Sequence, residues 1–378
     1  MTGFDLPFSF YIVFAFLFGL AIGSFLNVVV HRIPRGESIV LPGSHCPSCG
    51  AQVRAFDNLP LVSFAILRGR CRQCRERISL VYPLVELLTG LIFVALIFKT
   101  GPTWEALLEF VFASVMIALI FIDARHHLLP NVITYPAFVF ALAAATARAG
   151  WGEQTSFTID ISIIIPGMES EFEGWRAALF GGLLFALAAP GFWLLDKLDL
   201  ILFGRYFEWE ETDEEVDEAE ARREMEMERR HDRAVYATMI FGLLAAIAWA
   251  AMVIFLSANN QRTDEEAYSG LLRASAGALI GGGLIWWIRA VYFFIRKLEG
   301  MGLGDVKMMS VGGAFLGWQG AFGVLLLGSI LGSVIGVISA YRSQRGLKTA
   351  LPFGVCLGAA SLILMLTATP FFRWYIGQ

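Results

Sequence analysis

Two pairs of cysteines in one polar stretch have the types and spacing to bind a metal ion. Cys46 and Cys49 form one Cys-x-x-Cys pair, and Cys71 and Cys74 form a second, with 21 residues between the pairs. Each pair can direct two sulfurs toward one centre, and two pairs complete a tetrahedral four-thiolate zinc site. The pattern favours zinc and leaves an iron site or a redox pair as alternatives. Because the stretch is too short for a substantial apolar core, the metal is expected to supply its folding free energy.

Two aspartates have the chemistry for acid–base catalysis. Asp123 follows the apolar run VMIALIFI, and Asp305 stands in GMGLGDVKMM. Charged residues at the ends of apolar helices are costly and point to function. Two carboxylates at one face indicate an aspartic peptidase, in which the pair shares a proton, one group activates water and the other protonates the peptide carbonyl oxygen. Gly302 and Gly304 are expected to permit unusual backbone angles and close approach of a substrate strand.

The helix ends predict different roles for these carboxylates. Asp305 opens its helix, where the macrodipole favours an anion, and Asp123 closes its helix, where an anion is disfavoured. The sequence therefore predicts that Asp305 is the base of the resting enzyme and that Asp123 is the protonated acid. The structural alternative is that Asp305 only caps its helix and that Asp123 pairs with Arg125 or Lys307.

The elements that carry these residues are predicted to be membrane helices. Of the 378 residues, 57% are hydrophobic and 16% are charged, whereas soluble domains average about 45–50% apolar and about 25% charged. These values exclude an ordinary soluble domain, a disordered chain and a nucleic-acid-binding protein, and they predict an all-α integral membrane protein. Apolar runs long enough to span a bilayer indicate about ten transmembrane helices. The runs are Phe8–Val30, Leu80–Phe98, Trp104–Ile122, Val132–Ala147, Trp175–Asp196, Val235–Leu256, Leu271–Ile295, Val306–Trp318, Gly320–Ala340 and Pro352–Phe372.

The placement of Lys and Arg predicts the orientation of the helices. Eight arginines lie between Arg32 and Arg77, in the loop that holds the cysteines, whereas the next connection contains only Lys99. An excess of Lys and Arg marks the cytosolic side of a membrane protein. The cysteine loop and both aspartates are therefore expected at the cytosolic face.

The chain is expected to divide into five segments. They are a first transmembrane helix (1–31), the cytosolic cysteine loop (32–79), helices that carry Asp123 (80–148), an insertion (149–267) and helices that carry the Gly-x-Gly-Asp motif (268–378). The insertion combines an outside stretch, two helices and an acidic cytosolic stretch. Gly328, Gly332 and Gly336 recur at four-residue spacing and predict a helix-packing seam.

The motifs resemble, in their order, those of the type IV prepilin peptidases. They are GSFLNVVVHRIPRGES (23–38), the two cysteine pairs, ISLVYPLVELLTG (78–90), LLPNVIT after Asp123, GMGLGDVKMMSVGGAFLGW (300–318) and LPFG (351–354). The resemblance implies a bifunctional enzyme of the bacterial inner membrane. It would cleave the short basic leader of type IV prepilins or type II secretion pseudopilins on the cytosolic side, after a glycine, and methylate the new N-terminal residue with S-adenosylmethionine.

The resemblance also implies roles for individual residues. Asp123 and Asp305 match the catalytic pair of the Gly-x-Gly-Asp class, and the four cysteines match the zinc-binding part associated with methylation. Polar residues beside the loop are candidates for the methyl-donor pocket, with anchoring of the loop as the alternative. They are Asn27, His31, Arg32 and Glu86. The expected partners are the prepilin and the lipid bilayer, and no nucleic acid.

Two features depart from the family pattern. The family's Leu-Pro-Asp reads Leu-Pro-Asn here, with Asn131, and the stretch between Ala149 and Tyr268 exceeds the usual form. The competing interpretations are a peptidase that lacks methyltransferase activity and a multi-span transporter with a cytosolic zinc module. Paired broken helices would favour the transporter.

Overall fold

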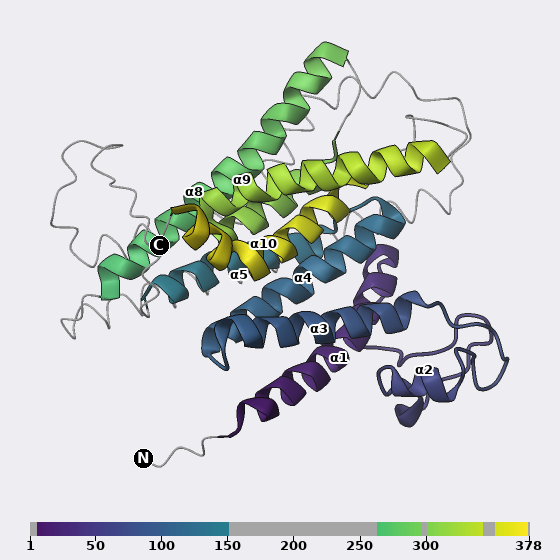
Figure 1. Ribbon diagram of the computed structural model, residues 1–378. Helices are drawn as coiled ribbons and strands as arrows, with labels where there is room; N and C mark the ends of the chain where they lie inside the picture. Colours follow the sequence, from purple (N-terminus) through teal and green to yellow (C-terminus); the bar gives the residue numbers. More distant parts are fainter. Residues whose placement is uncertain (1–5, 151–262, 297–300, 343–351, 377–378) are drawn as a thin grey trace, which may run out of the picture. The chain divides into compact units, whose positions relative to one another are not determined.

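The regular secondary structure in the described part of the chain is helical. The computed structural model describes residues 6–150, 263–296, 301–342 and 352–376 (Figure 1). Within these ranges the structure contains no β-strand, only two isolated bridges. The long helices are α1 (Phe8–Arg32), α3 (Val81–Thr100), α4 (Trp104–His126), α5 (Asn131–Gly150), α8 (Thr263–Arg296), α9 (Leu303–Arg342) and α10 (Phe353–Ile376). The short ones are η1 (Ile33–Arg35), η2 (Ala55–Asn58) and α2 (Val62–Ile66). The predicted all-α class is confirmed.

Several described helices are suited to cross a membrane. Five segments are long and apolar enough to do so. They are Phe8–Arg35, Val81–Thr100, Trp104–His126, Arg273–Arg296 and Leu303–Ile338. The predicted spans Trp175–Asp196 and Val235–Leu256 lie outside the described residues. The chain is therefore a multi-pass membrane protein, and the total of about ten helices stays a prediction.

Helix α9 contains a break at Gly317, where φ is 77° and ψ is 174°. The sequence predicts two helices here, Val306–Trp318 and Gly320–Ala340, with their boundary beside this glycine. A positive φ is strained for residues that carry a Cβ but accessible to glycine. The two predicted helices therefore occur as consecutive parts of α9, joined at Gly317.

The first of two compact units comprises residues 1–130 and 323–378. It contains α1, α3, α4, α10 and the last part of α9. Figure 1 shows α1 and α3 side by side, and α4 packs against both of them and against α10. The core is apolar and aromatic, with the rings of Phe93 and Phe110 stacked at a centroid distance of 4.0 Å.

Glycines on α1 bring its backbone close to α3. A Cβ at Gly19 would lie 2.7 Å from the Cα of Gly90, and a Cβ at Gly23 would lie 2.6 Å from the Cα of Glu86. Small residues four positions apart allow such backbone contact between membrane helices. This contact fixes α1 beside the start of α3, and therefore fixes the two ends of the cysteine loop that joins them.

The second unit comprises residues 131–322 and contains α5, α8 and the first part of α9. Its core includes Tyr135, Ile285 and Phe315, which are fully buried or nearly so. A Cβ at Gly277 of α8 would lie 2.1 Å from the carbonyl oxygen of Gly313 on α9. The backbones of α8 and α9 are thus in direct contact, which places the first turns of α9 against its neighbours.

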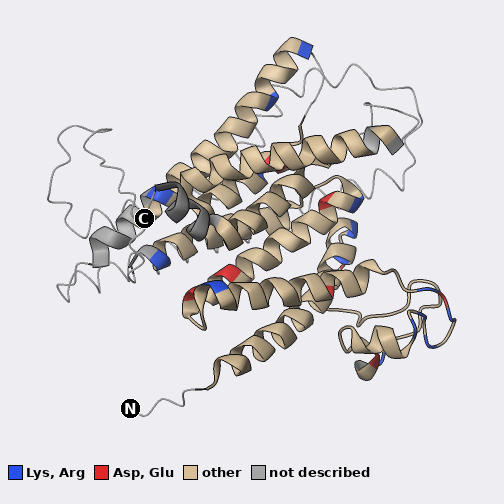
Figure 2. Ribbon diagram, in the orientation of Figure 1, with Lys and Arg blue, Asp and Glu red and all other residues tan. Residues whose placement is uncertain are grey.

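Charged residues of the described helices lie mainly toward helix ends, and others lie in the cysteine loop (Figure 2). At the connection between α3 and α4, Lys99 Nζ donates a hydrogen bond to Glu109 Oε1 at 2.7 Å, and the Thr100 hydroxyl donates to Glu109 Oε2 at 2.7 Å. These bonds satisfy a buried carboxylate within the protein, as an apolar environment requires.

The predicted seam on α9 is confirmed for two of its three glycines. A Cβ at Gly328 would lie 3.0 Å from a Leu357 side-chain atom, and one at Gly332 would lie 3.6 Å from Phe353, both on α10. Among the described residues, nothing lies within 4 Å of a Cβ placed at Gly336. Gly336 is therefore a natural control for the packing glycines.

We expect Gly19→Ala and Gly23→Ala to be less stable than Gly336→Ala by about 1–3 kcal/mol each, the usual cost of overpacking. All three changes gain the same helix preference, so the difference isolates the steric effect on the contact between α1 and α3. Thermal or denaturant unfolding in detergent measures it. Equal stabilities for the three variants would contradict the close packing.

Candidate active site and metal centre

Each Cys-x-x-Cys pair forms a tight turn closed by backbone hydrogen bonds. The N–H of Cys46 donates to the carbonyl oxygen of Ala51 at 2.9 Å, and the N–H of Cys71 donates to that of Glu76 at 2.8 Å. An isolated antiparallel bridge flanks each turn. The two halves of the loop therefore repeat one local structure, in which the backbone orients both sulfurs of a pair.

The residue after each pair adopts a left-handed backbone. Gly50 has φ 69°, and Arg75, at the same place in the second turn, has φ 61°. Glycine reaches this region without a steric penalty, whereas Arg75 incurs one. The second turn thus adopts the same backbone conformation as the first, although Arg75 disfavours it. We infer that the orientation of the two sulfurs requires this conformation.

The four sulfurs form one cluster. The Sγ atoms of Cys46, Cys49, Cys71 and Cys74 all lie within 4.8 Å of one another, and those of Cys46 and Cys74 are 3.8 Å apart. Tetrahedral zinc with bonds of about 2.3 Å requires sulfur–sulfur distances of about 3.8 Å. The cluster therefore has the size and ligand type that a zinc ion needs, as the spacing predicts.

The electrostatics of the cluster also favour a bound cation. The backbone N–H of Cys49 is the main cause that lowers the pKa of Cys46 to about 6. At Cys74 the backbone N–H of Glu76 favours the thiolate, but desolvation and the three neighbouring sulfurs raise the pKa to about 12. Thiolates this close repel one another, and a divalent cation removes that repulsion while it keeps the thiolates deprotonated.

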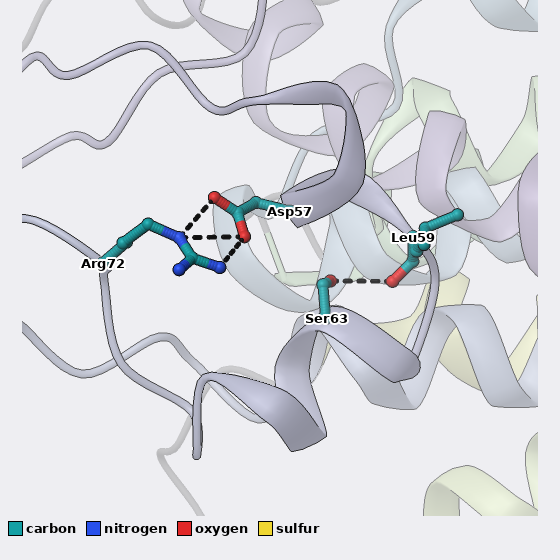
Figure 3. A network of polar contacts seen from close by, with 4 residues as sticks. All are labelled: Asp57, Leu59, Ser63 and Arg72. Carbon is teal, nitrogen blue, oxygen red and sulfur yellow. Dashed lines mark hydrogen bonds and ion pairs between the residues drawn. The ribbon is translucent and has the colours of Figure 1, made fainter.

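An ion pair joins the middle of the loop to the second cysteine pair. Figure 3 shows Arg72 in bidentate contact with Asp57, with Arg72 Nη2 2.6 Å from Asp57 Oδ1. The guanidinium group holds the pKa of Asp57 below its ordinary value. Nearby, the Ser63 hydroxyl donates to the Leu59 carbonyl oxygen at 2.7 Å and reinforces the start of α2.

Side chains of α1 anchor the loop. Buried Arg32 donates to the carbonyl oxygens of Ser38 at 2.9 Å and Gly43 at 3.2 Å. Asn27 Nδ2 donates to the carbonyl oxygen of Tyr82 at 3.0 Å and so ties α1 to the first turn of α3. These contacts hold the beginning of the cysteine loop against α1 and join α1 to the start of α3, where the loop ends.

Glu86 of α3 holds the loop from the other side. Its Oε2 accepts a hydrogen bond from the N–H of Leu61 at 2.9 Å. Leu61 has φ 58°, a strained value for a residue with a Cβ, and this bond supports it. The side chain of His31 contacts that of Arg35. The contacts of the four predicted pocket residues fit loop anchoring; their part in a methyl-donor pocket stays a prediction, and we derive no step through S-adenosylmethionine.

Asp123 lies in the last turn of α4 and is 6% exposed. Its Oδ2 accepts a hydrogen bond from the N–H of Val355, in the first turn of α10, at 3.0 Å. The carboxylate therefore lies at the C-terminus of one helix and at the N-terminus of another, and their dipoles oppose each other at this point. The prediction that Asp123 is the acid considered only α4. Sequence reasoning missed Val355, although the LPFG motif that precedes it was a visible signal.

Asp305 lies in the first turn of α9 and is 8% exposed. Its N–H donates to the carbonyl oxygen of Gly302 at 3.2 Å. Neither Gly302 nor Gly304 has a positive φ, and the close approach of a substrate strand that these glycines would permit stays a prediction. The helix simply begins here, and Gly304 has helical geometry. Among the described residues, a Cβ at Gly302 would lie within 4 Å only of the Gly304 nitrogen, at 3.9 Å.

The two aspartates belong to different units, Asp123 to the first and Asp305 to the second. Each is buried within its own unit, where the Asp123 carboxylate and the Asp305 backbone N–H make hydrogen bonds. Their meeting at one face, with a shared proton, stays a prediction.

Comparison with known proteins identifies the family. Residues 17–100 match the bacterial peptidase A24 N-terminal domain, and residues 231–337 match the type IV leader peptidase family. The prepilin leader peptidase/N-methyltransferase of Aeromonas hydrophila is 27% identical over an alignment that covers 97% of this chain and 94% of that protein. The chain belongs to the type IV leader peptidase family. The resemblance stated from the motifs is confirmed.

Other members of the type IV leader peptidase family match as well. The prepilin leader peptidase/N-methyltransferase of Myxococcus xanthus is 46% identical over 148 residues, which are 38% of this chain and 44% of that protein. That of Pseudomonas aeruginosa is 25% identical, with 97% of this chain and 93% of that protein covered. No solved structure matches the chain.

We expect Cys46→Ser and Cys71→Ser to lose most of the zinc that the purified protein carries, because each removes one of four ligands from a site that holds about one ion. Cys356→Ser is the matched control, since Cys356 is buried in α10 and lies outside the cluster. Elemental analysis of the purified variants measures zinc per chain. Full zinc content in Cys46→Ser would exclude the four-thiolate site.

Proposed function

We propose that this chain is a prepilin leader peptidase with an attached N-methyltransferase activity. The observation that carries the proposal is that two aspartates, each buried at the end of an apolar helix, occur in a member of the type IV leader peptidase family. Relatives that cover almost the whole chain carry the name prepilin leader peptidase/N-methyltransferase. Acids buried in membrane helices also occur in transporters, so the family match is what favours the peptidase over a transporter.

The substrate we propose is the basic leader of a type IV prepilin or a type II secretion pseudopilin. Cleavage would take place after a glycine, at the cytosolic face of the bacterial inner membrane. The arginine-rich cysteine loop supports this orientation, because Lys and Arg mark the cytosolic side. Asp123 lies at the same end of the first unit as this loop, since Arg125 of α4 acts electrostatically on His31 of α1.

The mechanism we propose uses Asp123 and Asp305 as a carboxyl pair that shares one proton. Two carboxyl groups at short distance cannot both ionise, so one is a base and the other an acid at neutral pH. The base removes a proton from water as the water attacks the scissile carbonyl carbon. The acid donates its proton to the carbonyl oxygen, which gives a tetrahedral gem-diol. The carboxyl group that took a proton from water then donates it to the amide nitrogen as the C–N bond breaks, and a hydroxyl of the gem-diol returns a proton to the other carboxylate as the new carboxyl group forms.

The cysteine cluster would hold zinc in the methylating part of the enzyme. The ion neutralises the thiolates and fixes the loop. The chain's own contribution is the anchoring of this loop by Asn27, Arg32 and Glu86. A peptidase that lacks methyltransferase activity is the second candidate function, because these side chains are engaged with the loop.

We expect Asp123→Asn and Asp305→Asn each to lower prepilin cleavage by roughly 100- to 10,000-fold, the usual contribution of general acid–base groups. Asp57→Asn is the control, because this aspartate lies in the cysteine loop and pairs with Arg72. Mass spectrometry of a co-expressed prepilin reports leader loss. Continued cleavage by both Asp123→Asn and Asp305→Asn would refute the aspartate mechanism.

We expect Cys46→Ser to abolish methylation of the new N-terminus while leader cleavage continues. The reason is that the metal stabilises a loop with little core of its own, whereas Asp123 is held by α4 and α10. The same mass spectrum separates the two activities, because the methyl group adds to the mass of the mature pilin. Methylation by Cys46→Ser would refute the role of the cysteine cluster in methylation. A wild-type protein that cleaves but never methylates would instead support the peptidase-only function.

A further inference from the structure

The turn that carries Asp305 has little means to fix its own conformation. Gly302 and Gly304 stand within three residues of the aspartate. Glycine has no side chain to pack and loses more conformational freedom on folding than any other residue. A reacting carboxylate must nevertheless be held in place, because a shift of about 1 Å can cost roughly 100-fold in rate. Contacts from outside the turn must therefore supply the rigidity.

The first such contact comes from α8. Arg289 is 4% exposed, and its Nε donates a hydrogen bond to the carbonyl oxygen of Met301 at 2.9 Å. Met301 immediately precedes the Gly-Leu-Gly-Asp sequence, so this bond fixes the point at which the turn begins. Burial of a guanidinium group is costly unless it is hydrogen-bonded. A charge-assisted bond to a carbonyl oxygen is correspondingly strong.

The second contact comes from α5. Lys307, two residues after Asp305 on α9, is 4% exposed, and its Nζ donates to Asn131 Oδ1 at 2.7 Å. The ammonium group also lies 5.3 Å from the centroid of the Tyr135 ring, within the range of a cation–π interaction. Asn131 is the first residue of α5 and Tyr135 follows one turn later. The contacts of Lys307 thus hold the first turn of α5 against the first turn of α9.

We propose that Arg289 and Lys307 are positioning residues for Asp305, one on each side of the turn. Arg289 fixes the backbone before the carboxylate, and Lys307, through Asn131 and Tyr135, fixes the helix after it. All of these residues lie within the second unit. The inference rests on the proposed function, in which Asp305 reacts with the prepilin.

Two substitutions at Arg289 separate the hydrogen bond from the charge. Gln places its amide nitrogen the same number of bonds from Cα as the Arg Nε, so Arg289→Gln retains the donor. Arg289→Met fills similar space without a donor. We expect Arg289→Met to lower kcat for prepilin cleavage roughly 10- to 100-fold with KM little changed, and Arg289→Gln to keep most of the activity.

Initial rates are measured on purified protein and corrected for the folded fraction found by thermal unfolding. Folded Arg289→Met with wild-type kcat would overturn the role of Arg289. Equal loss in folded Arg289→Gln and Arg289→Met would overturn it as well, because the donor would then have no separate effect.

A double-mutant cycle tests the contact from α5. Asn131→Leu and Lys307→Met are each expected to lower kcat roughly 10-fold or more, and the double variant no further, because either change breaks the same bond. Asn131→Asp keeps an acceptor and is expected to remain within a few-fold of wild type. Lys99→Met is the control, since Lys99 is paired with Glu109 in the α3–α4 connection and is expected to leave kcat unchanged.

Full additivity of Asn131→Leu and Lys307→Met, or a large loss in folded Asn131→Asp, would overturn the role of this pair. A wild-type protein that fails to cleave any prepilin would instead refute the proposed function. The two failures are therefore distinguishable in one set of assays.

Discussion

The burial of polar groups among apolar helices is the constraint on which the described structure depends. A charged or hydrogen-bonding group removed from water costs several kcal/mol unless the protein satisfies it. Asp123 is satisfied by the N–H of Val355, and Arg289 by the carbonyl of Met301. Each bond also joins segments that lie apart in the sequence. Both candidate catalytic aspartates lie at helix ends, and such ends provide the unpaired backbone groups that buried polar side chains need.

The sequence predicts most accurately what is encoded locally. The cysteine cluster follows from two Cys-x-x-Cys pairs, because a knuckle forms within about six residues and its spacing is visible. The placement of Asp123 and Asp305 at helix ends follows from the limits of apolar runs. The hydrogen-bond partners of the buried polar side chains cannot be predicted from local sequence in this way. Val355 is 232 residues from Asp123, and Asn131 is 176 residues from Lys307, so no periodicity connects them.

The cysteine loop shows how a segment without a core is nevertheless given a defined shape. Apolar side chains such as Val40, Leu41 and Ile66 remain at least 70% exposed, so hydrophobic burial contributes little to its folding. The backbone is instead fastened at its base by Arg32 and Glu86. The sulfur cluster closes its outer part. Anchoring to α1 and α3 thus gives the polar residues beside the loop a structural role, and a metal ion held by the four sulfurs would stabilise the loop further.

The departure at Asn131 shows what that position requires. The family pattern has an aspartate there, and loss of a carboxylate so near the Gly-x-Gly-Asp turn raises doubt about the site when only the sequence is considered. In the structure the side chain accepts a hydrogen bond from Lys307 through Oδ1, an atom that asparagine and aspartate share. This hydrogen bond therefore needs an acceptor oxygen at the end of a short side chain. A neutral asparagine and a charged aspartate both provide one. An amide at this position adds no negative charge beside the first turn of α9, where the helix N-terminus favours an anion. The substitution is therefore compatible with a catalytic role for Asp305.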